Sequence, residues 1–209
     1  MIYTMSGSNT TFTNLSRLEI HRLTKEALKG SIEALKMVLN FLTRFEIRSF
    51  KVIAYLIVYQ TVMNLDLELG NDCEKCGGTC CKSGPEIPLY SFDLEELKNV
   101  DSLSISKAIK CSSGYCYLLR PCVFQVEWRC LIHRYKPYAC LSYPFTSEEV
   151  QYSVISNPRN IPPLPIIPDT CIAAKKVWIK IYSKIEEFKE KHRRAPEPLE
   201  VLRLMQTTT

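Results

Sequence analysis

The fold of this chain is decided by the stretch Cys73-Glu-Lys-Cys76-Gly-Gly-Thr-Cys80-Cys81. Two residues separate Cys73 from Cys76, and a turn of that length can bring two thiolates to one metal ion. Zinc takes four such ligands in a tetrahedron at about 2.3 Å, and iron–sulfur clusters also use closely spaced thiolates. Gly77 and Gly78 follow directly, where glycine permits positive φ and a close approach of the backbone. The stretch predicts a thiolate site for zinc or an iron–sulfur cluster.

Cys80 and Cys81 are adjacent, and side chains on neighbouring residues tend to diverge. The pair is therefore expected to serve two metals, or one metal and one supporting role. Free cysteines are often only small buried hydrophobic residues. That alternative is disfavoured here because four cysteines occur within nine residues.

Six further cysteines complete the set of ten, and none precedes Cys73 or follows Cys171. A second group comprises Cys122, Cys130 and Cys140. Eight thiols could supply two four-coordinate sites, or one four-cysteine cluster with four left for disulfides or packing. The other two flank the short sequence Ser-Ser-Gly-Tyr, and they are expected to be structural, as a local disulfide. They are Cys111 and Cys116.

Taken together, these residues resemble the CxxCxxCC family of zinc- or iron-chelating cysteine-cluster proteins. The resemblance covers roughly residues 70–172 and includes the late cysteine. Its downstream motifs are Cys122-Val-Phe and Cys130-Leu-Ile-His133-Arg-Tyr-Lys136-Pro137-Tyr-Ala-Cys140-Leu-Ser-Tyr143-Pro144-Phe145. The resemblance implies a metal-ligand set of eight: Cys73, Cys76, Cys80, Cys81, Cys122, Cys130, Cys140 and Cys171. A flagellin lysine methylase has a related cysteine pattern and links the family to an enzyme.

The chain departs from the family pattern at three places. Three residues separate Cys76 from Cys80, where two are expected. Lys136 stands where the family has arginine, and Leu141 stands where a second arginine follows the cysteine. Lysine keeps the positive charge but not the bidentate fork of a guanidinium. These changes are compatible with a metal site and weaken the case for arginine-dependent chemistry.

Other candidate site residues are expected to be structural. His133 could replace a thiolate as a zinc ligand, but a packed or hydrogen-bonded histidine is the preferred interpretation. Residues 143–145, Tyr-Pro-Phe, are expected to pack around the site. His21 and His192 fall in helical patterns and are expected to face solvent.

Composition is that of an ordinary globular protein. The chain has 209 residues, 46% hydrophobic and 23% charged, with a formal net charge of +5. Its basic residues are scattered, so nucleic acid is not an expected partner. Residues 1–13 lack the basic start and apolar run of a signal peptide, and the apolar run at residues 52–63 is too short to span a bilayer. We therefore expect a cytoplasmic protein, in which clustered cysteines bind metal more often than they form disulfides.

Helical periodicity dominates the N-terminal part of the chain. A disordered tail is expected over residues 1–13, and a helical hairpin over residues 14–68. The first helix extends to about Phe45, begins at a capping box formed by Ser16 and Glu19, and is weakened at Gly30. The second runs from Arg48 to about Asp66 and is apolar on nearly all sides, so it should be buried, covering the cluster.

The remainder is expected to form the cysteine-cluster domain, residues 69–172, and a C-terminal helical segment, residues 173–209. A loop is expected over Leu69–Pro88, and Ser91 is expected to cap the helix that follows. Residues 111–145 are expected to form short strands and turns. Five prolines within residues 157–168 indicate an extended strap. A helix should run from Asp169 to about His192, with one or two further turns over residues 196–205.

The predicted fold is mainly α, with a small irregular α+β cysteine-rich metal-binding region, and with the N-terminal helical hairpin and the C-terminal helix packed around the cluster. The predicted function is binding of zinc or an iron–sulfur cluster, with the physiological role open. One alternative is an iron–sulfur enzyme of redox or methyl-transfer type, so enzyme status is left undecided. Another is an interaction module stapled by disulfides. A protein partner or homodimer could use the N-terminal hairpin.

Overall fold

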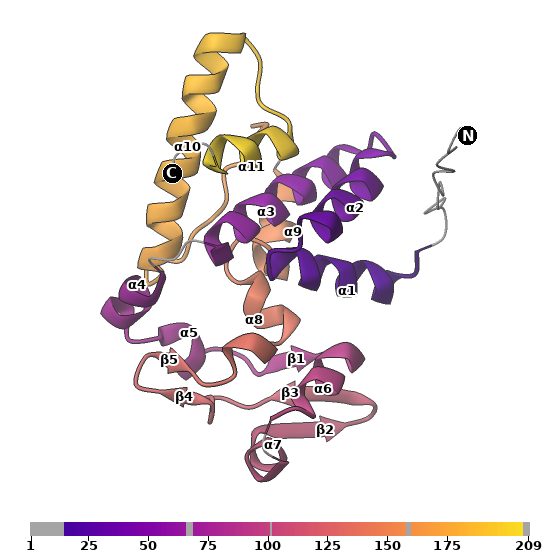
Figure 1. The fold of residues 1–209 in the computed structure, drawn as a ribbon, viewed down its shortest axis with the longest axis vertical. Coiled ribbons are helices and arrows are strands. Elements are labelled where there is room, and N and C mark those ends of the chain that lie inside the picture. The colour runs from indigo at the N-terminus through magenta and orange to yellow at the C-terminus, as the bar shows by residue number, and fades with distance from the viewer. Residues whose placement is uncertain (1–14, 66–68, 101, 158–159, 207–209) are drawn as a thin grey trace, which may run out of the picture.

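Helices dominate the computed structural model, which describes residues 15–65, 69–100, 102–157 and 160–206. Its larger part is helical, and a smaller part mixes short helices with short strands (Figure 1). The predicted class, mainly α with a small α+β region, is confirmed. The predicted disordered tail lies outside the described residues.

Three helices form the N-terminal part: α1 (Arg17–Leu28), α2 (Ile32–Thr43) and α3 (Arg48–Leu65). The predicted capping box is confirmed, because Ser16 and Glu19 cap α1 reciprocally. The expectation of one helix up to Phe45 is wrong. Gly30 adopts φ +105°, which an α-helix does not allow, and the chain turns there between α1 and α2. The predicted hairpin is therefore a three-helix unit.

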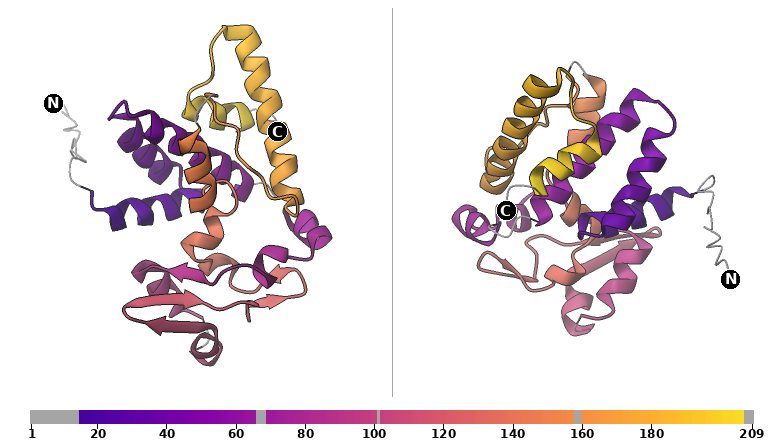
Figure 2. Two further views of the ribbon diagram at one scale, coloured as in Figure 1. Left: turned by 180° about the vertical axis from the view of Figure 1, so that it is seen from behind. Right: turned by 45° about the horizontal axis from the view of Figure 1, so that its top comes forward.

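The larger hydrophobic core surrounds α3, whose apolar run is buried as predicted. Two C-terminal helices complete this core, α10 (Ile172–His192) and α11 (Pro198–Gln206). The helix predicted from Asp169 to about His192 is present as α10, and an apolar stripe on it is buried, comprising Ala173, Val177, Ile181 and Ile185. Figure 2 shows from two sides that α10 and α11 lie over the helical part. The apolar run of α3 is thus covered mainly by other helices rather than by the thiol cluster.

The predicted loop over Leu69–Pro88 is wrong in its first half. It contains two short helices, α4 (Leu69–Cys76) and α5 (Thr79–Lys82). Beyond them lie β1 (Ile87–Leu89) and α6 (Ser91–Leu97), and α6 begins at Ser91 with Tyr90, not Ser91, as its N-cap.

The mixed part contains a three-stranded antiparallel sheet in the order β1-β3-β2. Helix α7 (Ser102–Ala108) leads into β2 (Ile109–Ser112), which pairs with β3 (Tyr115–Leu118). A second hairpin joins β4 (Gln125–Val126) to β5 (Arg129–Cys130). These strands confirm the short strands and turns predicted for residues 111–145. They pack on a second, smaller hydrophobic cluster, made of Ile87, Leu97, Ala108, Leu118, Phe124 and Ile132.

Three short elements return the chain to the helical part: the 3-10 turn η1 (His133–Tyr135), α8 (Tyr138–Ser142) and α9 (Glu148–Ser156). Helix α9 was not predicted. The described part of the proline-rich segment, residues 160–168, has no regular secondary structure, as expected of a strap. Within the described residues, no helix has both the length and the apolar composition needed to cross a bilayer.

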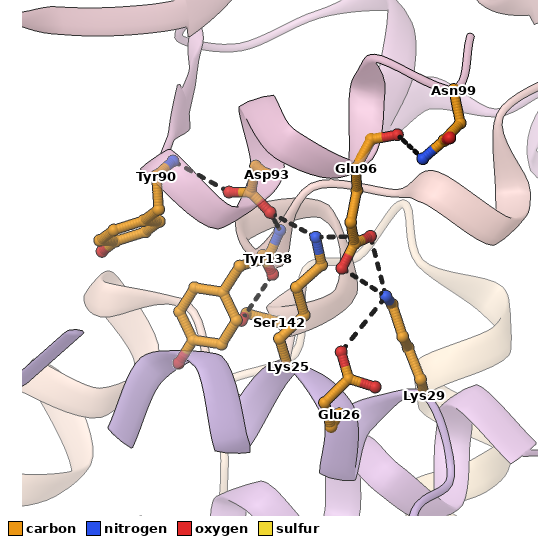
Figure 3. A network of polar contacts seen from close by, with 9 residues as sticks. All are labelled: Lys25, Glu26, Lys29, Tyr90, Asp93, Glu96, Asn99, Tyr138 and Ser142. Atoms are coloured by element: carbon orange, nitrogen blue, oxygen red, sulfur yellow. Dashed lines mark hydrogen bonds and ion pairs between the residues drawn. The ribbon is translucent and has the colours of Figure 1, made fainter. Parts of the chain in front are cut away.

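One buried polar network joins the two parts of the molecule (Figure 3). Lys25 on α1 and Asp93 on α6 form an ion pair with a 2.6 Å N–O distance, and both side chains are fully buried. The amide N–H of Tyr138, at the start of α8, donates to the same carboxylate. The network therefore fixes the position of the cysteine-containing part relative to the N-terminal helices.

Candidate metal site

Helices α4 and α5 position the first four candidate thiols. Cys73 and Cys76 lie three residues apart on α4, so their side chains share one face of the helix. Gly77 and Gly78 both adopt φ +66° and end α4, and the Gly78 amide donates to the Cys73 carbonyl oxygen. This turn starts α5, which contains Cys80 and Cys81. The glycines predicted to shape the backbone near the sulfurs therefore do so.

Hydrogen bonds hold the second group of cysteines against this turn. The Cys122 amide donates to the Cys81 carbonyl oxygen over 3.0 Å, which joins segments 41 residues apart. Gln125, opposite Cys130 in the β4–β5 hairpin, donates through its side-chain amide to the carbonyl oxygens of Gly77 and Gly78. Cys130 therefore lies on a hairpin anchored to the end of α4.

Two helices bring in the remaining candidates. Cys140 lies on α8, and Cys171 is the N-cap of α10. The first turns of α10 pack against α4, where the Lys176 ammonium lies 2.6 Å from the carboxylate of buried Asp72. This ion pair is one residue from Cys73, so it fastens the start of α10 beside the first cysteines. Each of the eight predicted ligands interacts electrostatically with at least one other of the set.

Burial and mutual contact set the protonation of these thiols. Burial raises the pKa of Cys73 to about 11 and that of Cys140 to about 12. Cys80 donates a hydrogen bond to the Cys81 sulfur, which raises the pKa of Cys80 and lowers that of Cys81. Cys73, Cys80 and Cys140 are therefore protonated at neutral pH when no metal ion is bound.

Two cations face the thiols. Burial raises the pKa values of Cys73, Cys130 and Cys140, and the Lys136 ammonium opposes that rise at each. Arg120 acts likewise on Cys122, and its guanidinium donates to the Ser83 carbonyl oxygen. Lys136 occupies a position of the family pattern, so the sequence pointed to it. Arg120 was not predicted, although its position two residues before Cys122 was a visible signal.

The ten cysteines divide into bonded and free thiols. Cys111 and Cys116 face each other across the β2–β3 hairpin and form the disulfide that their spacing suggested. The eight predicted ligands are free thiols, of which Cys80 is the exposed one and the others are half-buried. Within the described residues, no three Cys, His, Asp or Glu side chains are arranged closely enough to hold an ion.

The structure corrects two expectations about histidines. His21 is partly buried, with its ring 5.1 Å from that of Tyr90, rather than facing solvent. His133 is exposed on η1 rather than packed, and Lys136 lowers its pKa. His192 is exposed, as predicted. Phe145 is buried, but it packs against Tyr59 in the larger hydrophobic core, and the packing of residues 143–145 around the site stays a prediction.

The fold and site define a mainly helical protein with a cysteine-rich domain whose donors suit zinc or iron. Residues 72–161 match the model of the CxxCxxCC family, whose description proposes a zinc- or iron-chelating domain. Residues 72–161 are therefore similar to this family, as the motifs suggested. Seven of the eight free cysteines fall within the match, and Cys171 lies beyond it. No curated protein and no solved structure matches the chain.

Proposed function

We propose that this protein binds zinc or an iron–sulfur cluster through eight cysteine thiolates. The proposed ligands are Cys73, Cys76, Cys80, Cys81, Cys122, Cys130, Cys140 and Cys171. The observation that supports this best is that the eight free thiols come from α4, α5, the β4–β5 region, α8 and the start of α10, and that each interacts electrostatically with others of the eight. The two remaining cysteines are joined to each other on a separate hairpin.

The chemistry of the donor set fits these metals. Thiolates are soft ligands, which favour zinc and iron–sulfur clusters over magnesium or calcium. Within the described residues no three such donors are close enough to hold an ion, so the sulfur atoms would have to move together when the metal binds. Metal sites of this kind commonly complete their geometry as the metal binds, because binding and folding are coupled.

Metal binding here would release protons. Burial raises the pKa values of Cys73 and Cys140 far above neutrality, so these groups are thiols before the metal arrives. A bound cation favours the thiolate form, and Lys136 favours it at the same two residues. The chain's own contribution is to orient the sulfurs, to limit the access of water and to place this positive charge.

The experiment is a metal analysis of protein purified without oxygen. A visible spectrum and the zinc and iron contents are measured together. Bound zinc without colour supports zinc handling or a structural zinc site. A brown protein with several irons supports a cluster. Replacing Cys76 by Ser should lower the metal content of either form and destabilise the fold, since metal binding contributes folding free energy.

The control is the double variant Cys111→Ser/Cys116→Ser, which removes two cysteines outside the proposed ligand set. It should keep the metal content of the unaltered protein. Protein with eight titratable thiols that takes up neither zinc nor iron after reconstitution would contradict the proposal.

Reduced thiols suit a reducing compartment, and on that ground we propose a cytoplasmic location. The disulfide lies on the β2–β3 hairpin, which carries none of the eight free cysteines. A partner protein or second copy at the N-terminal helices stays a prediction, which light scattering of the purified protein tests. No residue of the site favours the methyl-transfer or redox alternative over binding alone.

A further inference from the structure

A cavity of about 460 Å³ lies between the first helix, α1, and the strands β1 and β3. That volume is within the range of small-molecule binding sites, which is about 300–1,000 Å³. Of the described residues around it, none is one of the eight free cysteines, so the cavity is separate from the candidate metal site. The residues that determine its chemistry come from α1 and from the side of the sheet: Arg17, Leu18, His21, Tyr90, Tyr115 and Tyr117.

Aromatic rings form the cavity wall on the side of the sheet. Tyr115 and Tyr117 are two residues apart on β3, so their side chains lie on the same face. Pro88 of β1 is the register partner of Tyr117 and lies on that face too. Tyr115 is 69% exposed, which leaves an aromatic ring open to a ligand. A flat ring can stack on such a wall, since aromatic pairs gain stability beyond the burial of apolar area.

Covalent and packing contacts hold this wall in place. Cys116, between the two tyrosines of β3, is joined by a disulfide to Cys111 on β2. At the other end of the wall, the Tyr90 ring stacks on Phe92, with the ring centroids 5.3 Å apart and the planes 4° apart. A wall that is already ordered loses little conformational entropy when a ligand binds, and this favours affinity.

Arg17 provides the polar end of the cavity. Its Nε donates to Nε2 of His21 over 3.4 Å, one helical turn further on. The His21 ring is in turn packed against two aromatic rings, with its centroid 5.1 Å from that of Tyr90 and 5.3 Å from that of Tyr138. Within the described residues, the two terminal guanidinium nitrogens donate to no other group. They are therefore available for the paired hydrogen bonds that a guanidinium makes with a carboxylate.

The charge of the cavity favours a negative ligand. Burial, and then the charge of Arg17, lower the pKa of His21, so its ring is neutral at pH 7. Among the described residues that line the cavity, Arg17 alone is then charged. Glu148 acts on His21 from α9, but it does not line the cavity. Lys110, the register partner of Tyr117 on β2, adds a second positive charge at this face of the sheet.

We propose that this cavity binds a small aromatic carboxylate, with its ring against Tyr115 and Tyr117 and its carboxylate on the Arg17 guanidinium. A singly charged carboxylate matches a lining with one cation better than a doubly charged phosphate does. This site is independent of the proposed metal site, because no predicted metal ligand contributes to it.

The test is a titration of the isotope-labelled full chain with indole-3-acetate, followed through the NMR shifts of its backbone amides. Indole-3-acetamide has the same ring without the charge, and tryptamine carries a positive charge instead. Indole-3-acetate should bind about tenfold more tightly than the amide, because it makes a charge-assisted hydrogen bond with Arg17. Tryptamine should bind most weakly. The largest shifts are expected at the amides of Leu89, Tyr90 and residues 115–117.

Four variants assign the contacts. Arg17→Gln should bind indole-3-acetate and indole-3-acetamide equally. Arg22→Gln is the matched control and should keep the preference, since Arg22 is exposed on the same helix but does not line the cavity. Tyr115→Ala should weaken the binding of both compounds, whereas Tyr152→Ala, which removes an exposed tyrosine of α9, should change neither. The amide spectrum of each variant also shows whether it is folded.

Three outcomes would overturn the proposed carboxylate site. One is an unaltered chain whose amides on β1 and β3 shift with none of the three compounds. The second is equal affinity of the unaltered chain for indole-3-acetate and indole-3-acetamide, which would leave Arg17 without a role. The third is a dimer in light scattering that Tyr115→Ala dissociates, which would make a second copy of the chain the occupant of this face. The proposed metal binding is measured separately by zinc and iron content, so its failure would leave these results unchanged.

Discussion

The ammonium of Lys25 lies 2.6 Å from a carboxylate oxygen of Asp93, 68 positions further along the chain, and neither side chain is exposed to solvent (Figure 3). The same oxygen accepts from the Tyr138 amide, and the other oxygen accepts from the Tyr90 amide. Lys25 belongs to a helix outside the family match, and Asp93 lies inside it. The pair therefore ties the N-terminal helices to the cysteine-rich domain.

Replacing Lys25 by Met should destabilise the protein by about 3–5 kcal/mol, because it leaves the Asp93 carboxylate buried without its cation. Lys29→Met is the matched control on the same helix. Lys29 is 26% exposed and pairs with Glu96, so its loss should cost about 0–1 kcal/mol. Urea unfolding of both variants measures the difference. Equal losses of unfolding free energy in the two variants would show that the buried ion pair stabilises the protein no more than the exposed one.

The long helices could be predicted from the sequence more reliably than the breaks between helices and the short helices. Helix α10 could be predicted because its apolar residues recur along one face. Helix α3 could be predicted because it is a long apolar run that is buried on nearly all sides. Helix α4 was missed because it contains Gly70, is followed by two glycines and is only eight residues long. Its helical form depends on tertiary contacts such as Asp72 with Lys176, 104 residues away, which no local pattern reveals.

Gln60 is the one amide inside the apolar run of α3, and it is fully buried. Its side-chain oxygen accepts from the Phe145 amide, and its nitrogen donates to the Tyr143 carbonyl oxygen. Gln60→Leu should cost about 1–3 kcal/mol for each backbone group left without a partner. Thermal or urea unfolding measures this loss.

The control for Gln60 is its neighbour, Thr61→Val. Thr61 is equally buried, but its hydroxyl only bonds the Ile57 carbonyl on the same helix. That variant should lose about 1 kcal/mol or less, since a single hydrogen bond adds little net stability. A Gln60→Leu protein as stable as Thr61→Val would contradict the structural role of the amide.

Gly78 has a positive φ and also lacks space for a side chain, whereas Gly114 has only the positive φ. Both have positive φ, so alanine strains the backbone at each. A Cβ at Gly78 would also meet the side-chain amide of Gln125, whereas nothing lies within 4 Å of one at Gly114. Gly78→Ala should therefore be the more destabilised variant, by about 1–3 kcal/mol more. It should also bind less zinc than Gly114→Ala, because Gln125 anchors the Cys130 hairpin. Equal zinc content in the two variants would contradict that link.

The candidate site was easier to predict than its surroundings. Thiol spacing alone pointed to Cys73–Cys81, and the short loop between Cys111 and Cys116 suggested their disulfide, which the structure contains. The burial of His21 against Tyr90 could not be predicted, since it depends on how the two cores pack. Arg120 could have been noted from its position two residues before Cys122, although its electrostatic effect on that thiol needed the structure.

Glu200 should make part of the stability depend on acid pH. Hydrogen bonds from the Arg194 guanidinium, and then from the Glu197 amide, lower the pKa of Glu200 from about 4.5 to about 2. A lowered carboxyl pKa gives stability that is fully present above the unfolded value near 4.5. That stability is lost as the pH falls toward 2. Since the pair is exposed, the contribution should be about 1 kcal/mol or less.

The variant Glu200→Gln isolates this contribution. Its free energy of unfolding should lie below that of the unaltered chain at pH 6, and the gap should shrink as the pH falls from about 4.5 to about 2. When Arg194 is already replaced by Gln, the further change Glu200→Gln should alter the free energy of unfolding less over the same pH range. The reason is that the main cause of the lowered Glu200 pKa has been removed. Urea unfolding across this range measures both. A gap that stays constant from pH 6 to pH 2 would mean that the ion pair does not lower the pKa of Glu200, and that its side chain stabilises α11 through neutral contacts alone.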